Sequence, residues 1–218
     1  MEIKSIGIIG SGAVGKALAE GFHKLGYQVA IGSRNPGKLT EWAEAFNGAI
    51  LTGTFEKAAQ QSDAIVLATR WAGKATRQAI VMAGKKNFTG KIVIDVTNPI
   101  VFQQPGEPPV LDIGYPRSGG EMVQKWIPEA HVVKAFNIIT ASYMANPKLN
   151  EGTPDMLVCG NSKEAKKWVT DIASEWGWPV HDLGNMDQAY LLEALAMIWI
   201  RFGFLNNHWN HAFKLLMK

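Results

Sequence analysis

The sequence predicts an α/β protein with a mostly parallel, doubly wound sheet, and three observations predict it. Short apolar segments alternate with longer amphipathic segments along most of the chain. The first apolar segment, residues 6–9, has no polar residues between its apolar ones, as expected of a parallel strand buried on both faces. A glycine-rich turn, a helical pattern and a second apolar segment follow it and complete a βαβ unit.

The first βαβ unit comprises a strand at 6–9, a helix at 13–25 and a strand at 27–31. Apolar residues recur at helical spacing in the helix, and Gly26 marks its end. The further strands are predicted at 49–51, 63–69, 91–96, 132–135, 156–160 and 179–183. The further helices are predicted at 38–46, 55–60, 72–83, 120–127, 162–176 and from about 186 to the end. Residues 99–118 are rich in Pro, Gly and Gln and are predicted to form a long loop that serves as a lid or pocket wall.

Turn-forming residues concentrate at 146–154, which suggests a division of the chain there. We predict a nucleotide-binding domain at 1–150 and a smaller, largely helical C-terminal lobe at 151–218, which would wall a substrate pocket, form a dimer contact, or do both. A strand–helix–strand pattern continues after this boundary. The alternative, that the sheet runs on and the lobe is not independent, therefore stays open.

The amino-acid composition limits which kinds of partner the protein is expected to bind and which cellular compartment it is expected to occupy. Hydrophobic residues make up 47% of the 218 residues, enough for a sizeable core, and the net charge of +3 comes from scattered basic residues rather than a basic stripe. The single cysteine, Cys159, cannot form an internal disulfide. We see no signal peptide and no apolar run of the roughly 18 residues that a membrane span needs. We therefore expect a cytoplasmic protein with no nucleic-acid or membrane partner.

The glycine-rich turn predicts a dinucleotide site in a Rossmann fold. Gly10 permits a tight turn, Gly12 leaves room for a pyrophosphate, and Gly15 lets the helix pack closely on the strand. The helix N-terminus offers N–H groups and partial positive charge to the phosphates. The predicted phosphate-binding residues are Gly10, Ser11, Gly12, Ala13, Val14 and Gly15.

The end of the second strand indicates which dinucleotide binds. Proteins that bind NAD usually place Asp or Glu there, whereas this chain has Ser33, Arg34, Asn35 and Lys38. A hydroxyl, a guanidinium and an ammonium suit the 2′-phosphate of NADP. Arg34 would either grip that phosphate or stack on the adenine, and the sequence therefore predicts NADP(H).

Three further strand ends are predicted to face the nicotinamide half of the cofactor, because ligands of this fold bind outside the carboxyl ends of the strands. Their side chains offer hydrogen bonds to the ribose or the carboxamide, although each is also a common turn residue. The predicted residues are Ala68, Thr69, Arg70, Asn98, Pro99, Ala135 and Asn137.

Other residues with reactive side chains are interpreted as structural. Asp95 is expected to cap backbone N–H groups, and Asp187 and Glu193 to lie on a helix surface. His208 and His211 are three residues apart on a predicted helix, but no third ligand is near in sequence, so we predict no metal site.

Taken together, these motifs resemble the F420-dependent NADP oxidoreductase family over nearly the whole chain. The resemblance is carried by residues 10–15, 32–35, 95–99, 132–137 and 192–202. The chain also resembles the oxidoreductase domain of the STEAP metalloreductases and, more distantly, pyrroline-5-carboxylate reductase.

The resemblance implies an enzyme that transfers hydride between NADP(H) and a deazaflavin such as coenzyme F420. It implies that Ser33, Arg34 and Lys38 hold the 2′-phosphate and that the deazaflavin stacks over the nicotinamide. No catalytic side chain is predicted, because such a transfer needs orientation and exclusion of water more than an acid or base. Trp71, Trp199 and Phe202 are the predicted pocket residues; the last two would roof a planar acceptor, belong to the core, or form a homodimer contact.

Two other functions stay open. The first is NADPH-dependent reduction of a small imine or carbonyl, for which Thr69, Thr97 or Tyr143 would have to supply the proton. The second is a non-catalytic NADP(H) sensor whose nicotinamide face is blocked, with Trp71 as the blocking residue.

Overall fold

The structure is a computed structural model that describes residues 2–216. Its centre is an eight-stranded sheet with the strand order β10–β9–β8–β5–β4–β1–β2–β3. Every neighbouring pair is parallel except β8 and β9, which are antiparallel. The strands are β1 (Ser5–Ile9), β2 (Gln28–Gly32), β3 (Ile50–Gly53), β4 (Ala64–Leu67), β5 (Ile92–Asp95), β8 (His131–Lys134), β9 (Met156–Gly160) and β10 (Val180–Asp182).

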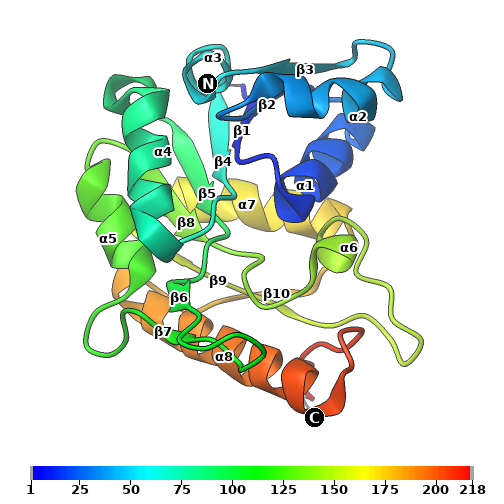
Figure 1. Ribbon diagram of the computed structural model, residues 1–218, viewed down its shortest axis with the longest axis vertical. Coiled ribbons are helices and arrows are strands. Elements are labelled where there is room, and N and C mark those ends of the chain that lie inside the picture. The colour runs from blue at the N-terminus through cyan, green and yellow to red at the C-terminus, as the bar shows by residue number, and fades with distance from the viewer. Residues whose placement is uncertain (1, 217–218) are drawn as a thin grey trace.

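Helices cover both faces of this sheet (Figure 1), which confirms the doubly wound α/β Rossmann fold. Successive strand residues enter opposite cores: Ile6 and Ile8 pack on one face, and Ile9 packs on the other. The helices on the first face are α1 (Ala13–Lys24), α2 (Thr40–Glu44), α6 (Ala141–Met144) and α7 (Lys163–Glu175). Those on the second are α3 (Phe55–Gln60), α4 (Ala75–Ala83), α5 (Gly119–Trp126) and α8 (Ala189–Asn206).

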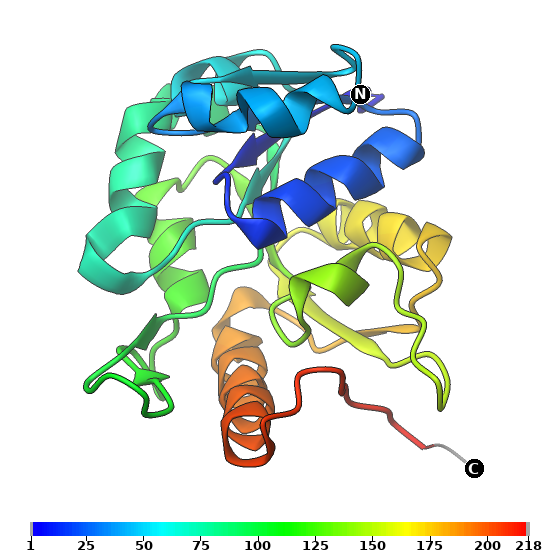
Figure 2. The ribbon, with the colours of Figure 1, turned by 45° about the vertical axis from the view of Figure 1, so that its right-hand side comes forward.

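The sheet continues across the predicted boundary near residue 150. β9 and β10 come from the segment after it and join strands that come from before it. Helix α8 lies at one end of the molecule (Figure 1), and the C-terminal segment runs back from its end (Figure 2). The role of residues 151–218 as a pocket wall or dimer contact stays a prediction.

Two predicted helices are broken in the structure. The segment 38–46 forms a 3-10 turn at Pro36–Leu39 followed by the short α2. The segment 72–83 begins with a 3-10 turn at Ala72–Lys74, and α4 starts only at Ala75. The break lies where Gly73 and Lys74 both have positive φ angles, 67° and 62°, which an α-helix cannot contain.

The loop 99–118 contains a small hairpin of β6 (Ile100–Val101) and β7 (Val110–Leu111). It is therefore less irregular than predicted.

The helical prediction for the tail is wrong after Asn206. Asn207 has a left-handed conformation, with φ 46°, and ends α8. The indole of Trp209 folds back onto Gly203, where a Cβ would lie 2.7 Å from the ring. His208 and His211 therefore lie in an irregular segment rather than on one helical face.

By length and composition, the described residues include one segment apolar enough to cross a membrane, Met186–Asn206, with a mean hydropathy of 1.3. Leu192, Ala196 and Trp199 of this segment are buried in the protein, and Glu193 is also buried. Its apolar composition is thus partly explained by contact with the sheet.

Candidate functional site

The glycine loop has the close contacts that the motif predicts. Gly10 has a φ of 129°, and a side chain there would collide with the carbonyl of Ala68. A side chain at Gly15 would collide with the carbonyl of Gly10. At Gly12, by contrast, a Cβ would meet none of the described atoms within 4 Å, so the space in front of it is open.

Helix α1 begins directly behind this open space. Its first helical bond runs from the N–H of Lys16 to the carbonyl of Gly12, 3.0 Å. No side chain in residues 2–216 caps the helix. Its first N–H groups are therefore free to bind an anion, and the loop has the form of a phosphate cradle.

The end of β2 carries hydroxyl and cationic groups in the predicted place. Ser33 is buried, and its Oγ accepts hydrogen bonds from the Ser11 hydroxyl (3.0 Å) and the Asn35 N–H (3.1 Å). Arg34 and Lys38 are exposed and form no ion pair with any described carboxylate. The Ser11–Ser33 hydrogen bond joins the glycine loop to this cationic end of β2.

The segment after β4 is held by hydroxyl groups. The Thr69 hydroxyl donates to Thr76 Oγ1 (3.1 Å), and the Thr76 hydroxyl donates to the carbonyl of Arg70 (2.9 Å). The Arg70 side chain is exposed. These hydrogen bonds fix the backbone that follows β4. The carbonyl of Ala68 in this segment faces Gly10 of the glycine loop.

Asn98 and Asn137 form an amide pair that joins the ends of β5 and β8. Asn98 Nδ2 donates to the carbonyl of Asn137 (2.8 Å), and Asn137 Nδ2 donates to Asn98 Oδ1 (2.9 Å) and to the carbonyl of Leu192 (3.0 Å). Pro99 and Ala135 are buried beside the pair. The Oδ1 atom of Asn137 is buried and has no partner in the described part of the chain, so one acceptor of the pair is unused.

Three ionised side chains are buried together just behind this pair. Lys134 Nζ lies 3.0 Å from Asp95 Oδ2 and 2.8 Å from Glu193 Oε1, and all three side chains are at most 1% exposed. Burial alone would lower the pKa of Lys134, but the two carboxylates outweigh it and raise that pKa above its usual value. We call Asp95, Lys134 and Glu193 the buried ion cluster.

The cluster corrects the interpretation of Glu193, which is not on a helix surface. Its carboxylate accepts hydrogen bonds from the N–H groups of Gly119 and Gly120, each 2.9 Å, at the start of α5. Asp95 does cap backbone, since its Oδ1 accepts from the Thr97 N–H (2.9 Å), but it also pairs with Lys134. Asp187 is exposed, as expected.

Neither the contacts of Gly119 and Gly120 with a carboxylate nor the burial of Glu193 was predicted from the sequence. A Cβ on Gly119 would lie 3.0 Å from Glu193 Oε1, and one on Gly120 would lie 2.8 Å from Ala189. The available signals were a lone acidic residue within the apolar segment 191–199 and a glycine pair at the start of a helix.

The predicted pocket residues have different surroundings. The indole of Trp71 is buried, donates to Asp112 Oδ2 (2.8 Å) and stacks on Trp126 at 5.5 Å. Trp199 is 8% exposed and donates to the carbonyl of His211 (2.7 Å), whereas Phe202 is 47% exposed. Contact of any of them with an acceptor stays a prediction.

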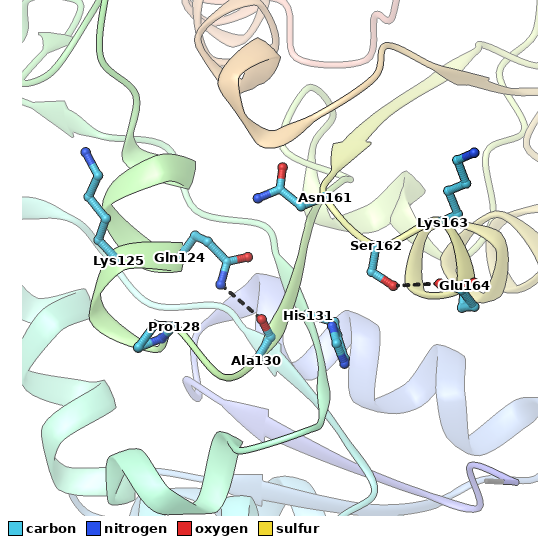
Figure 3. Close-up of a pocket in the computed structure, with 9 residues that line it drawn as sticks. All are labelled: Gln124, Lys125, Pro128, Ala130, His131, Asn161, Ser162, Lys163 and Glu164. Atoms are coloured by element: carbon cyan, nitrogen blue, oxygen red, sulfur yellow. Dashed lines mark hydrogen bonds between the residues drawn. The ribbon is translucent and has the colours of Figure 1, made fainter.

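Figure 3 shows the residues that line a cavity of about 730 Å³. It lies where β8 begins, at His131, and beside the N-terminus of α7, at Ser162. It includes none of the predicted cofactor residues. The predicted cofactor residues follow the carboxyl ends of β1, β2, β4, β5 and β8, where ligands of this fold bind, so we place the candidate site there and not in the cavity.

Cysteine and metal chemistry find no support at this edge. Burial raises the pKa of the Cys159 thiol to about 12. Within residues 2–216, no group of three His, Cys, Asp or Glu side chains is arranged to hold a metal ion.

Comparison with known proteins agrees with this geometry. A family model described as NADP oxidoreductase, coenzyme F420-dependent, matches residues 5–99. The F420-dependent NADP reductase of Methanocaldococcus jannaschii is 30% identical over 183 residues, which cover 79% of this chain and 80% of the relative. A solved structure of a candidate F420-dependent NADP reductase from Arthrobacter sp. FB24 is 32% identical, covers 99% of this chain and 100% of the other, and superposes with a TM-score of 0.91.

A longer relative shares the same module. Metalloreductase STEAP3 of Rattus norvegicus is 27% identical over 197 residues, which are 90% of this chain and 37% of that protein. This chain therefore spans little more than a third of the metalloreductase. The match to the M. jannaschii reductase, which covers about four fifths of both chains, shows that this chain belongs to the F420-dependent NADP oxidoreductase family.

Proposed function

We propose that this protein transfers hydride between NADP(H) and a deazaflavin of the F420 type, or a similar planar acceptor. The observation that carries the proposal is the 30% identity to an F420-dependent NADP reductase across about four fifths of both chains. In the reducing direction, hydride leaves C4 of the nicotinamide and joins C5 of the deazaflavin. NADPH becomes NADP⁺, and the deazaflavin is reduced as it takes up that hydride and one proton from solvent.

The residues present fit NADP(H) at two points. The open space at Gly12 suits a pyrophosphate, and Arg34 and Lys38, which pair with none of the described carboxylates, suit a 2′-phosphate. Ser33, with its hydroxyl already positioned by Ser11, would complete the phosphate contacts.

The chain would act mainly by orientation. The ionisable groups of the buried ion cluster are paired with one another, so they are not available as a general acid or base. Transfer between two stacked rings needs neither, but it does need the rings held face to face and shielded from water. Residues 99–118 and helix α8 are the segments we assign to the walls of the acceptor pocket.

The alternative functions find less support. An imine or carbonyl reductase needs a free proton donor. Of the three candidates, the Thr69 hydroxyl donates to Thr76 and the Thr97 hydroxyl donates to Asp95 (2.7 Å), which leaves Tyr143 as the donor that this alternative would need. A sensor with a blocked nicotinamide face would need Trp71 over that face, but its indole is bound to Asp112.

We further propose a homodimer in the cytoplasm. Helix α8 presents an exposed apolar stripe whose members are spaced by seven, four and three residues, the spacing of a helix-packing face. The residues are Leu191, Ile198, Phe202 and Leu205. Light scattering across a range of concentrations tests the dimer, and a monomer at all of them would contradict it.

The test of the reaction is the visible absorbance of an F420-type deazaflavin during incubation with the protein and NADPH. We expect the absorbance to bleach rapidly with NADPH and slowly or not at all with NADH. No bleaching, in a sample shown by titration to bind NADPH, would contradict the deazaflavin and leave the cofactor assignment intact.

A further inference from the structure

Glu193 connects four segments that are distant in sequence. Its Oε1 contacts Lys134 at the end of β8, and both carboxylate oxygens accept N–H groups at the start of α5. Lys134 in turn contacts Asp95 at the end of β5. Glu193 thus joins α8 directly to the end of β8 and, through Lys134, to the end of β5.

The hydrogen bonds of this connection are complete. The ammonium of Lys134 has three acceptors, namely Asp95, Glu193 and the carbonyl of Thr97. Asp95 receives two further bonds from Thr97. A buried ionic network holds one geometry when every member is satisfied, and removing one member leaves the others uncompensated.

The residues next to Glu193 and Thr97 in sequence contact the Asn98–Asn137 amide pair. The residue before Glu193, Leu192, offers its carbonyl to Asn137 Nδ2, and the residue after Thr97 is Asn98, whose Oδ1 accepts from the same nitrogen. Asn137 is therefore hydrogen-bonded to the residue before Glu193, and Asn98 directly follows Thr97, which bonds to both Asp95 and Lys134. A shift of α8 would move the Leu192 carbonyl and release Asn137.

We propose that Glu193 is a positioning residue for the nicotinamide half of NADP(H), acting through Lys134 and Leu192 on the Asn98–Asn137 pair. This inference rests on the placement of the nicotinamide half at the ends of β5 and β8, and not on the identity of the acceptor. The adenosine half is proposed to bind at Arg34 and Lys38, which follow β2. Because β4 and β1 separate β2 from β5 in the sheet, binding of this half should not depend on Glu193.

The test compares two ligands of the complete protein by calorimetry. Adenosine 2′,5′-bisphosphate carries the adenosine and the 2′-phosphate only, whereas NADPH carries both halves. The variant is Glu193→Gln, which keeps the size of the side chain but places an amide NH₂ among N–H donors. We expect the Kd of NADPH to rise about tenfold, the effect of about one lost hydrogen bond, and the Kd of the bisphosphate to stay within about twofold.

Asp187→Asn is the matched control, because Asp187 lies in the turn before α8 and is exposed. We expect it to bind both ligands as the wild type does. A folded Glu193→Gln that binds both ligands like the wild type would overturn the inference. So would a loss of equal size for both ligands, because that indicates a general structural effect. Wild-type protein that failed to bind NADPH would instead overturn the cofactor assignment itself.

A second variant covers the case in which Glu193→Gln does not fold. Gly119→Ala keeps every charge but adds a Cβ 3.0 Å from Glu193 Oε1 and 3.2 Å from Pro99. We expect a several-fold rise in the Kd of NADPH alone. An unchanged Kd, or an equal rise for both ligands, would overturn the inference.

Discussion

The ammonium of Lys134 lies 2.8 Å from the carboxylate of Glu193, and neither group is more than 1% exposed to solvent. One residue ends a central strand and the other belongs to the C-terminal helix, so this contact attaches the helix to the sheet. Because Asp95 shares the same ammonium, the cluster contains two carboxylates and one cation.

Removing the cation should destabilise the fold strongly. Lys134→Met leaves two carboxylates buried without a counter-charge, and we expect a loss of about 3–5 kcal/mol in the free energy of unfolding, measured with urea.

Lys167→Met is the control for this prediction. Its ion pair with Asp171, 2.6 Å, is on the surface, where the side chains are 75% and 54% exposed. We expect a change of about 0.5 kcal/mol or less. An equal loss of unfolding free energy in the two variants would show that the buried ion cluster contributes no more to stability than a surface ion pair.

Arg34→Asp should change the nucleotide preference. It removes a charge-assisted contact to the 2′-phosphate and adds repulsion, so we expect NADPH binding to weaken about 100-fold and NADH binding less than about threefold. Arg201→Asp makes the same charge change at an exposed position on α8 and should leave both affinities unchanged. Equal loss of NADPH and NADH in Arg34→Asp would rule out the 2′-phosphate role.

Gly12→Val should separate binding from folding. The new side chain enters the open space in front of Gly12, so it would block the pyrophosphate of both nucleotides. The cost to stability should be about 1 kcal/mol, that of a poorer helix N-cap. Gly15→Val is the contrasting variant: its side chain meets the Gly10 carbonyl, so it should cost about 3 kcal/mol or more. Retained nucleotide binding by Gly12→Val would mean that the loop does not cradle the pyrophosphate.

The C-terminal segment should loosen in acid. Asp155 is buried and accepts from the Leu215 N–H (2.8 Å) and pairs with His181 (3.0 Å). Burial raises the pKa of Asp155, but the hydrogen bonds from His181 and Leu215 and the nearby Lys214 outweigh it, so the pKa is lowered.

A lowered carboxyl pKa stabilises the folded state above the unfolded value, about 3.8–3.9, and this stabilisation is lost as the pH falls through the folded value. The urea midpoint of Asp155→Asn should therefore lie well below that of the wild type at about pH 6 and approach it at about pH 3. A constant difference between the two proteins would show that Asp155 does not contribute through its charge.

Much of the fold could be predicted because the buried strands are short apolar runs and the first βαβ unit is marked by three glycines. The strand at Met156–Gly160 and the helix at Phe55–Gln60 have the predicted bounds. The helix predicted at 72–83 failed at Lys74, since a left-handed non-glycine residue has no signal in apolar spacing.

The buried ion cluster could not be predicted for a different reason. An acidic residue on an apolar helix usually faces solvent, and only tertiary packing brings Glu193 to Lys134. The geometry of Gly10, Gly12 and Gly15 depends on neighbours in sequence, whereas that of Glu193 depends on the ends of β5 and β8 and on α5.

Isotope transfer tests the proposed reaction most directly. NADPH labelled with deuterium at the nicotinamide C4 is incubated with the protein and an F420-type deazaflavin in ordinary water, and the reduced deazaflavin is analysed by mass spectrometry and NMR. Direct hydride transfer predicts deuterium at C5 of the deazaflavin. A reduced deazaflavin without deuterium, or no reduction by protein that binds NADPH, would contradict it.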